Sequence, residues 1–298
     1  MPSSSLRVRF DRFLLPSSIS RQAVCLRSDL DDVATYQECG GGVFLQPSYD
    51  PVRREVVLRQ EPGSRLALDT VYKLTLLVAS SEGNCTGETP TSCGIRAFDR
   101  APLEKPYTFT FKTVAASPGS VPDEGPPPAD FCGDDGVVQS LGGCGYSPCH
   151  APAKDGPGAA AGLDLSGLLF GDFGPLEATA INRVAHQTQM GERADDIEET
   201  PARFGRAMPI IDASQRGVSG TPGNSYLLYK LLVGPTADIA TGDVRASDEE
   251  IERLRASVVV GLPMAPDSPL DGDGARSAAK LVALSNWIAR GAPTPACP

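Results

Sequence analysis

The chain has 298 residues, which is enough for two hydrophobic cores of ordinary size. Its formal net charge of −10 is divided unevenly: residues 1–120 contain 14 Lys and Arg against 13 Asp and Glu, and residues 121–298 contain 13 against 24. Because no part of the chain is strongly basic, nucleic acid is excluded as a partner. No apolar run is long enough to predict a transmembrane helix.

The N-terminus carries no export signal of its own. Met1 is followed by Pro and Ser residues and then directly by a strand pattern, without the charged start and apolar core of a signal peptide. The cysteine content discussed below nevertheless favours an exported protein. We therefore expect an extension ahead of Met1 that supplies an export signal, with a lipid anchor on a lipoprotein cysteine as a further option.

Residues 5–114 predict a small antiparallel β-sandwich. Apolar side chains alternate with polar ones in three segments, namely Leu6-Val8-Phe10, Tyr72-Leu74-Leu76-Val78 and Tyr107-Phe109-Phe111. Further strands are predicted near residues 23–26, 42–45 and 55–59. Gly, Pro, Asn and Asp fill the intervals between them, as is typical of a sandwich with tight turns.

Several segments of this half resemble the bacterial immunoglobulin-like (Ig-like) domains of surface proteins. They are Arg7–Phe10, Leu15–Ser18, Tyr49–Pro51, Leu66–Tyr72 and Phe109–Thr113. The resemblance implies an Ig-like sandwich. Such domains usually have one more strand before the position of Leu6, so we expect that the sandwich lacks its first strand in this chain.

Residues 115–130 predict a linker. This segment is rich in Pro, Gly and Ser and has too few apolar side chains to fold, so it is expected to be a semi-rigid spacer. It separates the sandwich from a second domain at residues 131–298.

The second domain opens with a cysteine-histidine motif. Cys144 and Cys149 precede His150, and a Cys-x-x-Cys-His sequence attaches haem c through two thioethers, with the histidine as an axial iron ligand. Here four residues separate the cysteines instead of two. The alternative is a disulfide between Cys144 and Cys149, or disulfides to other cysteines, with His150 an ordinary surface residue.

Four sequence pieces follow this motif in a fixed order. They are Gly-Leu-Asp-Leu at 162–165, Pro-Gly-Asn-Ser-Tyr-Leu at 222–227, Leu-Pro-Met-Ala-Pro at 262–266 and Trp-Ile-Ala-Arg-Gly-Ala at 287–292. Together with the motif they resemble the class I-like cytochrome c domains of large exported bacterial proteins, several of which have the longer C-x4-C-H spacer. The resemblance covers about residues 130–298 and implies one covalent haem c.

Met264 is the first candidate for the sixth iron ligand. Its thioether suits haem iron, and the flanking Pro263 and Pro266 stiffen the predicted ligand loop. Met208 is a rival, because the family more often has Met followed directly by Pro, as at Met208. His186 would give a bis-histidine site instead. Each methionine could also simply fill space in a core.

The second domain is expected to be mainly α-helical. Helical patterns occur near residues 134–141, 177–186, 224–233, 248–258 and 275–290. Ser247 and Glu250 form a predicted capping box, and Gly291 predicts the end of the last helix. The predicted fold class is therefore multidomain: a β-sandwich (Ig-like) followed by a mainly α-helical cytochrome c-like domain.

Eight cysteines favour an oxidising compartment, so we expect the protein at the periplasm or cell surface. If two of them hold haem, six remain and 15 pairings are possible. Pairing of neighbours suggests three disulfides: Cys25 with Cys39, Cys85 with Cys93, and Cys132 with Cys297.

We therefore predict a c-type haem electron carrier of the bacterial cell envelope and not an enzyme. The chain has two histidines and lacks His-Glu-x-x-His, Gly-x-Ser-x-Gly and phosphate-loop motifs. The expected partner is a redox protein, and an acidic haem domain would favour a basic one. The alternative is an envelope binding or scaffold protein that uses its Ig-like domain, with a second domain that is haem-free or a haem sensor. A third hypothesis is a haem peroxidase, which would need an open distal site.

Overall fold

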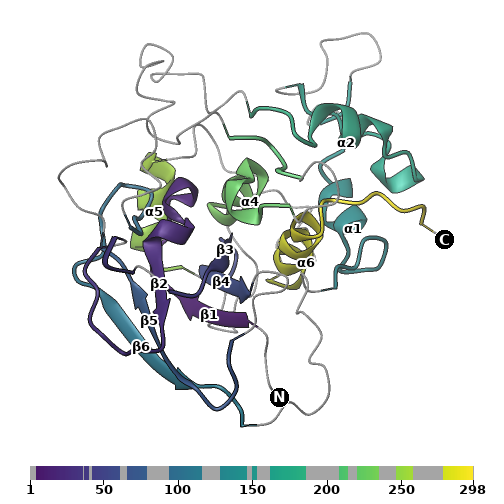
Figure 1. Ribbon diagram of the computed structural model, residues 1–298. Coiled ribbons are helices and arrows are strands. Elements are labelled where there is room, and N and C mark those ends of the chain that lie inside the picture. The colour runs from purple at the N-terminus through teal and green to yellow at the C-terminus, as the bar shows by residue number, and fades with distance from the viewer. Residues whose placement is uncertain are drawn as a thin grey trace. The chain divides into compact units, whose positions relative to one another are not determined.

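The computed structural model divides into two compact units, which we describe separately (Figure 1). Unit 1 comprises Met1–Asp50 and Arg54–Gly125, and unit 2 comprises Pro51–Arg53 and Pro126–Pro298. The structure describes residues 5–35, 37–39, 42–60, 66–78, 94–115, 128–145, 150–152, 162–185, 208–213, 220–234, 246–257 and 278–297. Most of the predicted linker lies outside these ranges, so the predicted domain bounds remain a prediction.

Unit 1 contains two three-stranded antiparallel sheets. The first has the order β1-β4-β3, with β1 at Ser5–Arg9, β3 at Leu45–Asp50 and β4 at Glu55–Gln60. The second has the order β2-β5-β6, with β2 at Val24–Arg27, β5 at Val71–Leu76 and β6 at Tyr107–Lys112. The turn Pro51 to Arg54 connects β3 and β4, whose register pairs Asp50 with Glu55.

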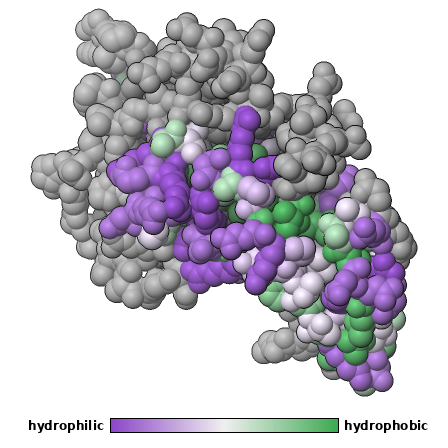
Figure 2. Space-filling model, turned by 90° about the vertical axis from the view of Figure 1, so that its left-hand side faces the viewer, coloured by the Kyte–Doolittle hydropathy of each residue, from purple (hydrophilic) through white to green (hydrophobic). Residues whose placement is uncertain are grey.

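Apolar side chains from both sheets form one core. Tyr49, Val56 and Leu58 come from the first sheet, and Leu26 and Leu74 come from the second. The alternation of apolar and polar residues thus places one face of each sheet in the core. Hydrophilic residues predominate among the described residues on the face of the molecule shown in Figure 2.

The Cys25–Cys39 disulfide predicted from the sequence is present. Both cysteines are buried and pack with Val33 and Leu77 in a small second cluster. The predicted Cys85–Cys93 pair lies outside the described residues.

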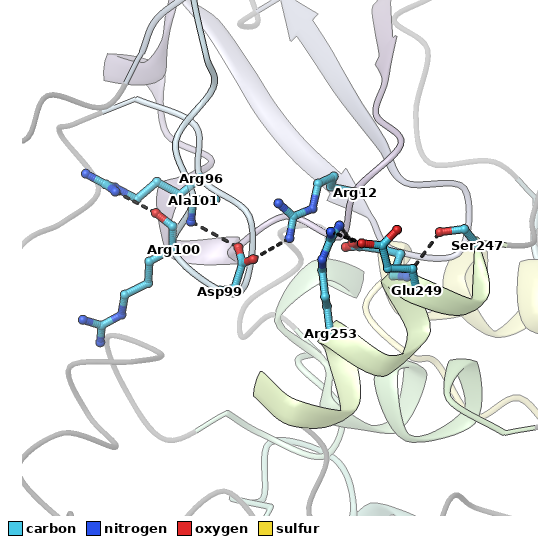
Figure 3. A network of polar contacts seen from close by, with 9 residues as sticks. Arg12, Arg96, Asp99, Arg100, Ala101, Ser247, Glu249 and Arg253 are labelled. Carbon is cyan, nitrogen blue, oxygen red and sulfur yellow. Dashed lines mark hydrogen bonds and ion pairs between the residues drawn. The ribbon is translucent and has the colours of Figure 1, made fainter.

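Asp99 organises a turn on the surface of unit 1. Its carboxylate accepts hydrogen bonds from Arg12 Nη2 at 2.6 Å and from the backbone N–H of Ala101 at 3.1 Å (Figure 3). The guanidinium of Arg96 donates to the carbonyl oxygen of Arg100 in the same turn at 2.8 Å. The Arg12–Asp99 ion pair is partly exposed, so we assign it no more than about 1 kcal/mol of stability.

Unit 2 contains short helices joined by irregular segments and 3₁₀ turns. The α-helices are α1 at Val137–Gly142, α2 at Gly174–Thr179, α4 at Tyr226–Leu232, α5 at Asp248–Ser257 and α6 at Ala278–Ala289. None of the helices in the described ranges is long and apolar enough to span a membrane.

The predicted fold class is wrong: the structure does not show a β-sandwich (Ig-like) followed by a mainly α-helical cytochrome c-like domain. It shows two small antiparallel sheets in unit 1 and, among the described residues of unit 2, helices of only 6 to 12 residues. The predicted helix at 177–186 illustrates the cause, because α2 ends at Thr179 and Ile181 and Val184 instead form isolated β-bridges with Ile211 and Pro209. Non-local backbone pairing therefore replaces the helical periodicity there.

The helix boundaries of α5 and α6 agree with the local signals. The hydroxyl oxygen of Ser247 accepts a hydrogen bond from the N–H of Glu250 at 3.2 Å, as in a capping box (Figure 3). After α6, Gly291 has φ +88° and its N–H donates to Ile288 O at 2.8 Å. The left-handed residue ends the helix as predicted.

The core of unit 2 is built around α6, which packs against α1 and α4. Leu281, Leu284, Trp287 and Ile288 are each 0% exposed, so the predicted apolar face of this helix is confirmed. The indole N–H of Trp287 donates to Pro293 O at 2.7 Å, which satisfies its polar atom inside the core.

A ring cluster and a disulfide join the two ends of unit 2. Phe131, just before α1, lies 5.9 Å from Trp287 and 5.0 Å from Phe173 between ring centroids. Next to it, Cys132 forms the predicted disulfide with Cys297. The two cysteines are 165 residues apart in the sequence, so the disulfide closes a long loop.

We predict that replacing both Cys132 and Cys297 by Ser lowers the free energy of unfolding of unit 2 by about 2–5 kcal/mol, because the unfolded chain regains the entropy of a long open loop. Urea titration of the full chain followed by tryptophan fluorescence measures this, since Trp287 is the only tryptophan and lies in unit 2. The matched Cys25→Ser, Cys39→Ser variant should leave that transition unchanged. An unchanged midpoint in the first variant would show that the disulfide does not stabilise unit 2.

Candidate functional site

The candidate site begins where α1 ends. The N–H of Cys144 donates to Leu141 O at 2.9 Å, and the N–H of Gly145 donates to Gly142 O at 3.0 Å, so a tight turn carries the chain out of the helix. Cys144 is half-buried and is not disulfide-bonded. Cys132 and Cys297 of the same unit, by contrast, are cross-linked.

His150 is held beside Cys144 by the main chain. Its backbone N–H donates to Cys144 O at 3.1 Å, and its own carbonyl oxygen accepts a hydrogen bond from the N–H of Leu165 at 2.7 Å. We call these two hydrogen bonds the backbone clasp. The first closes a loop that contains Cys149, which itself lies outside the described residues. His150 is half-buried, so its imidazole is neither fully sequestered nor fully solvated.

The segment around Leu165, whose N–H donates to His150 O, carries buried apolar side chains. Leu163, Leu165 and Leu168 are buried, with exposed fractions of 6%, 2% and 1%. Between them, the N–H of Asp164 donates to Thr179 Oγ1 at 3.0 Å, which ties the segment to the end of α2. These leucines belong to the buried core, so they hold the segment that pairs with His150 in place.

A close backbone contact at Gly145 completes the clasp. A Cβ atom on Gly145 would lie 2.3 Å from Leu165 O, which is closer than any side chain can approach. A Cβ on the neighbouring Gly143 would meet nothing within 4 Å. Of these two glycines, Gly145 is therefore the one that must be glycine for steric reasons.

The candidate sixth ligands are only partly described. Met264 and His186 lie outside the described residues, so the structure tests neither. Met208 is 2% exposed, and its carbonyl oxygen accepts a hydrogen bond from Ala185 N at 2.9 Å. Met208 therefore occupies a core position, which is the ordinary role of a buried methionine.

Two ionisable groups lie on the elements that follow Met208. Burial raises the pKa of Asp212, and hydrogen bonds from Asn224 and Thr221 partly offset this by lowering it. Asn224 Nδ2 donates to Asp212 Oδ2 at 2.6 Å. Burial also lowers the pKa of Lys230 on α4. The Asp212–Asn224 contact connects the segment after Met208 to the 3₁₀ turn at Pro222–Asn224, so we assign it a structural role.

Cys144 and His150 were predicted from the sequence, whereas Gly145 and the backbone of Leu165 were not. The Gly-Leu-Asp-Leu piece was noted only for its resemblance, and its pairing with His150 is a non-local backbone contact that no periodicity reveals. Within the described ranges, no group of three or more His, Cys, Asp or Glu is placed to hold a metal ion.

Comparisons with known proteins identify no family. No model of a protein family matches the chain, and no curated protein sequence matches it. The function is therefore argued from the residues of the site.

We predict that Gly145→Ala lowers the free energy of unfolding of unit 2 by about 1–3 kcal/mol, because the added methyl collides with Leu165 O. Gly143→Ala is the matched control and should change stability by less than about 1 kcal/mol, in the stabilising direction. Urea unfolding followed by Trp287 fluorescence distinguishes the two. Equal effects of the two substitutions would show that the contact at Leu165 does not constrain the turn.

Proposed function

We propose that the protein is a c-type haem electron carrier of the bacterial cell envelope. Cys144 and Cys149 would attach one haem c by thioether bonds, and His150 would be an axial ligand of the iron. The observation that carries the proposal is the backbone clasp, in which the N–H of His150 donates to Cys144 O and the N–H of Leu165 donates to His150 O.

The residues present suit this cofactor. Each thiol would add across one haem vinyl group: sulfur bonds to one vinyl carbon and the thiol proton ends on the other, so no external oxidant is needed. His150 would offer a neutral ring nitrogen to the iron. The buried Leu163, Leu165 and Leu168 would supply apolar surface and keep water away. When bound, the haem iron would supply a one-electron ferrous–ferric couple.

The remaining features support an exported protein. The Cys25–Cys39 and Cys132–Cys297 disulfides favour an oxidising compartment, so we place the protein at the periplasm or cell surface. A carrier needs a redox partner protein, and the net charge of residues 121–298 favours a basic one.

We predict that the full chain, exported by a bacterial host that attaches haem, gains the mass of one haem and shows a reduced α band. Replacing Cys144 and Cys149 together by Ser should abolish attachment, because no thiol then remains beside His150. The Cys25→Ser, Cys39→Ser variant controls for general damage and should still carry haem. Intact-mass spectrometry and the pyridine haemochrome spectrum measure both.

A colourless, folded product with Cys144 joined to Cys149 would contradict the proposal. It would favour the alternative of an envelope binding or scaffold protein whose second unit carries no haem.

The sixth ligand is tested by three substitutions in the haem-loaded protein. We expect Met264→Ala to remove any sulfur-to-iron charge-transfer absorption, lower the potential and admit azide, because a thioether favours ferrous iron and blocks the open site. Met208→Ala should keep the spectrum and instead cost about 2–5 kcal/mol of stability, since that side chain is buried. A silent Met264→Ala with an altered spectrum in His186→Ala would mean a bis-histidine site.

A further inference from the structure

One apolar turn of unit 2 is exposed next to the candidate site. The 3₁₀ turn η7, Leu168–Phe170, buries Leu168 but leaves Leu169 38% and Phe170 85% exposed. Phe170 is the most exposed of the large hydrophobic side chains in the described ranges. A single exposed aromatic is ordinary, so its significance depends on how it is held and what surrounds it.

The turn is held firmly by its own backbone. Gly167 O accepts hydrogen bonds from the N–H of Phe170 at 2.9 Å and from the N–H of Asp172 at 3.0 Å. The N–H of Leu168 donates to Leu165 O at 3.3 Å. Phe170 is thus presented on a defined turn, and binding through it would lose little backbone entropy.

The turn also lies against the helix that leads into the site. It packs on α1, and a Cβ atom on Gly142 would lie 2.3 Å from Leu169 Cδ2, so the Leu169 side chain covers the last residue of α1. Cys144 follows Gly142 by two residues. The N–H of Leu165, which precedes the turn, donates to His150 O. A protein bound at Phe170 would therefore lie beside the segment that we assign to haem attachment.

The described segment that contains the turn is acidic. The described residues 162–185 include three carboxylates, Asp164, Asp172 and Glu177, and one cationic side chain, Arg183. Asp172 and Glu177 are exposed, and Asp172 follows Phe170 within the same turn. The Arg183 guanidinium donates to Ala178 O at 2.8 Å.

We propose that Leu169 and Phe170, with the carboxylates Asp164 and Asp172, form the docking surface for a basic redox partner protein; this rests on the proposed function. An apolar centre with a charged rim is the usual anatomy of a protein interface, and an exposed aromatic is a frequent anchor. The negative charge opposes the two other occupants: a second copy of this acidic unit and an anionic membrane would both be repelled.

The test uses the haem-loaded full chain and a lysine-rich soluble cytochrome c as the probe. Stopped-flow absorbance measures the second-order rate constant of electron exchange at low ionic strength. We expect Phe170→Ser to lower this constant about tenfold, because the apolar anchor is lost. Phe44→Ser is the matched control, since Phe44 is 52% exposed in unit 1, and it should react as the wild type does.

Charge is tested separately. Asp172→Asn keeps an oxygen that can accept the hydrogen bond from Gly174 N and should slow electron exchange about two- to threefold at low salt only, because salt screens the attraction. Asp11→Asn, an exposed change in unit 1, should have no such effect. An acidic blue-copper protein used as the probe should be insensitive to Phe170→Ser.

The outcomes separate this inference from the proposed function. Haem attachment with equal rate constants for wild type and Phe170→Ser would overturn the docking surface and leave the carrier function standing. Absence of haem in the wild type would overturn the carrier function. In that case Phe170→Ser is tested for binding of the probe to the haem-free chain. Weaker binding would support a protein-binding site at Phe170, and unchanged binding would overturn it. The inference would also be overturned if the wild type bound anionic vesicles and Phe170→Ser abolished that binding. The same holds if the wild type formed a dimer in ultracentrifugation and Phe170→Ser abolished the dimer.

Discussion

The structure of unit 2 depends on the packing of α6 against α1. Both helices are too short to be stable alone, so their burial against each other supplies the stability that helix propensity cannot. Trp287 on α6 is fully buried with Phe131 beside it, and the Cys132–Cys297 disulfide joins the segments that flank the two helices. The position of Cys144 depends on this packing, because Cys144 lies in the tight turn directly after α1.

The backbone clasp extends this order to the candidate site. It uses backbone N–H and C=O groups of Cys144, His150 and Leu165. Gly145 is the steric condition for this arrangement, because any larger residue would push the chain away from Leu165.

Local signals predicted the parts of the fold that local interactions decide. The alternation in Tyr72 to Leu76, the capping residue Ser247 and the apolar face of α6 all specify structure within a few residues, and each was found. The mainly helical second domain was predicted wrongly because a helical pattern after Thr179 competes with distant backbone partners. Similarly, the sequence named Cys144 and His150, but the contact that joins His150 to Leu165 depends on how the intervening chain folds back, which no local pattern encodes.

Covalent attachment of a cofactor suits a unit of this kind. Short helices enclose little apolar area, so non-covalent contacts alone would hold a large planar group weakly. The unit already relies on one covalent cross-link between its ends, Cys132–Cys297. Two thioethers at Cys144 and Cys149 would act in the same way, because they would fix the cofactor to a loop whose ends the backbone clasp already holds together. Cys144 and Cys149 would then share one physical role with Cys132–Cys297, which is to replace the contact area that the short helices of unit 2 do not provide.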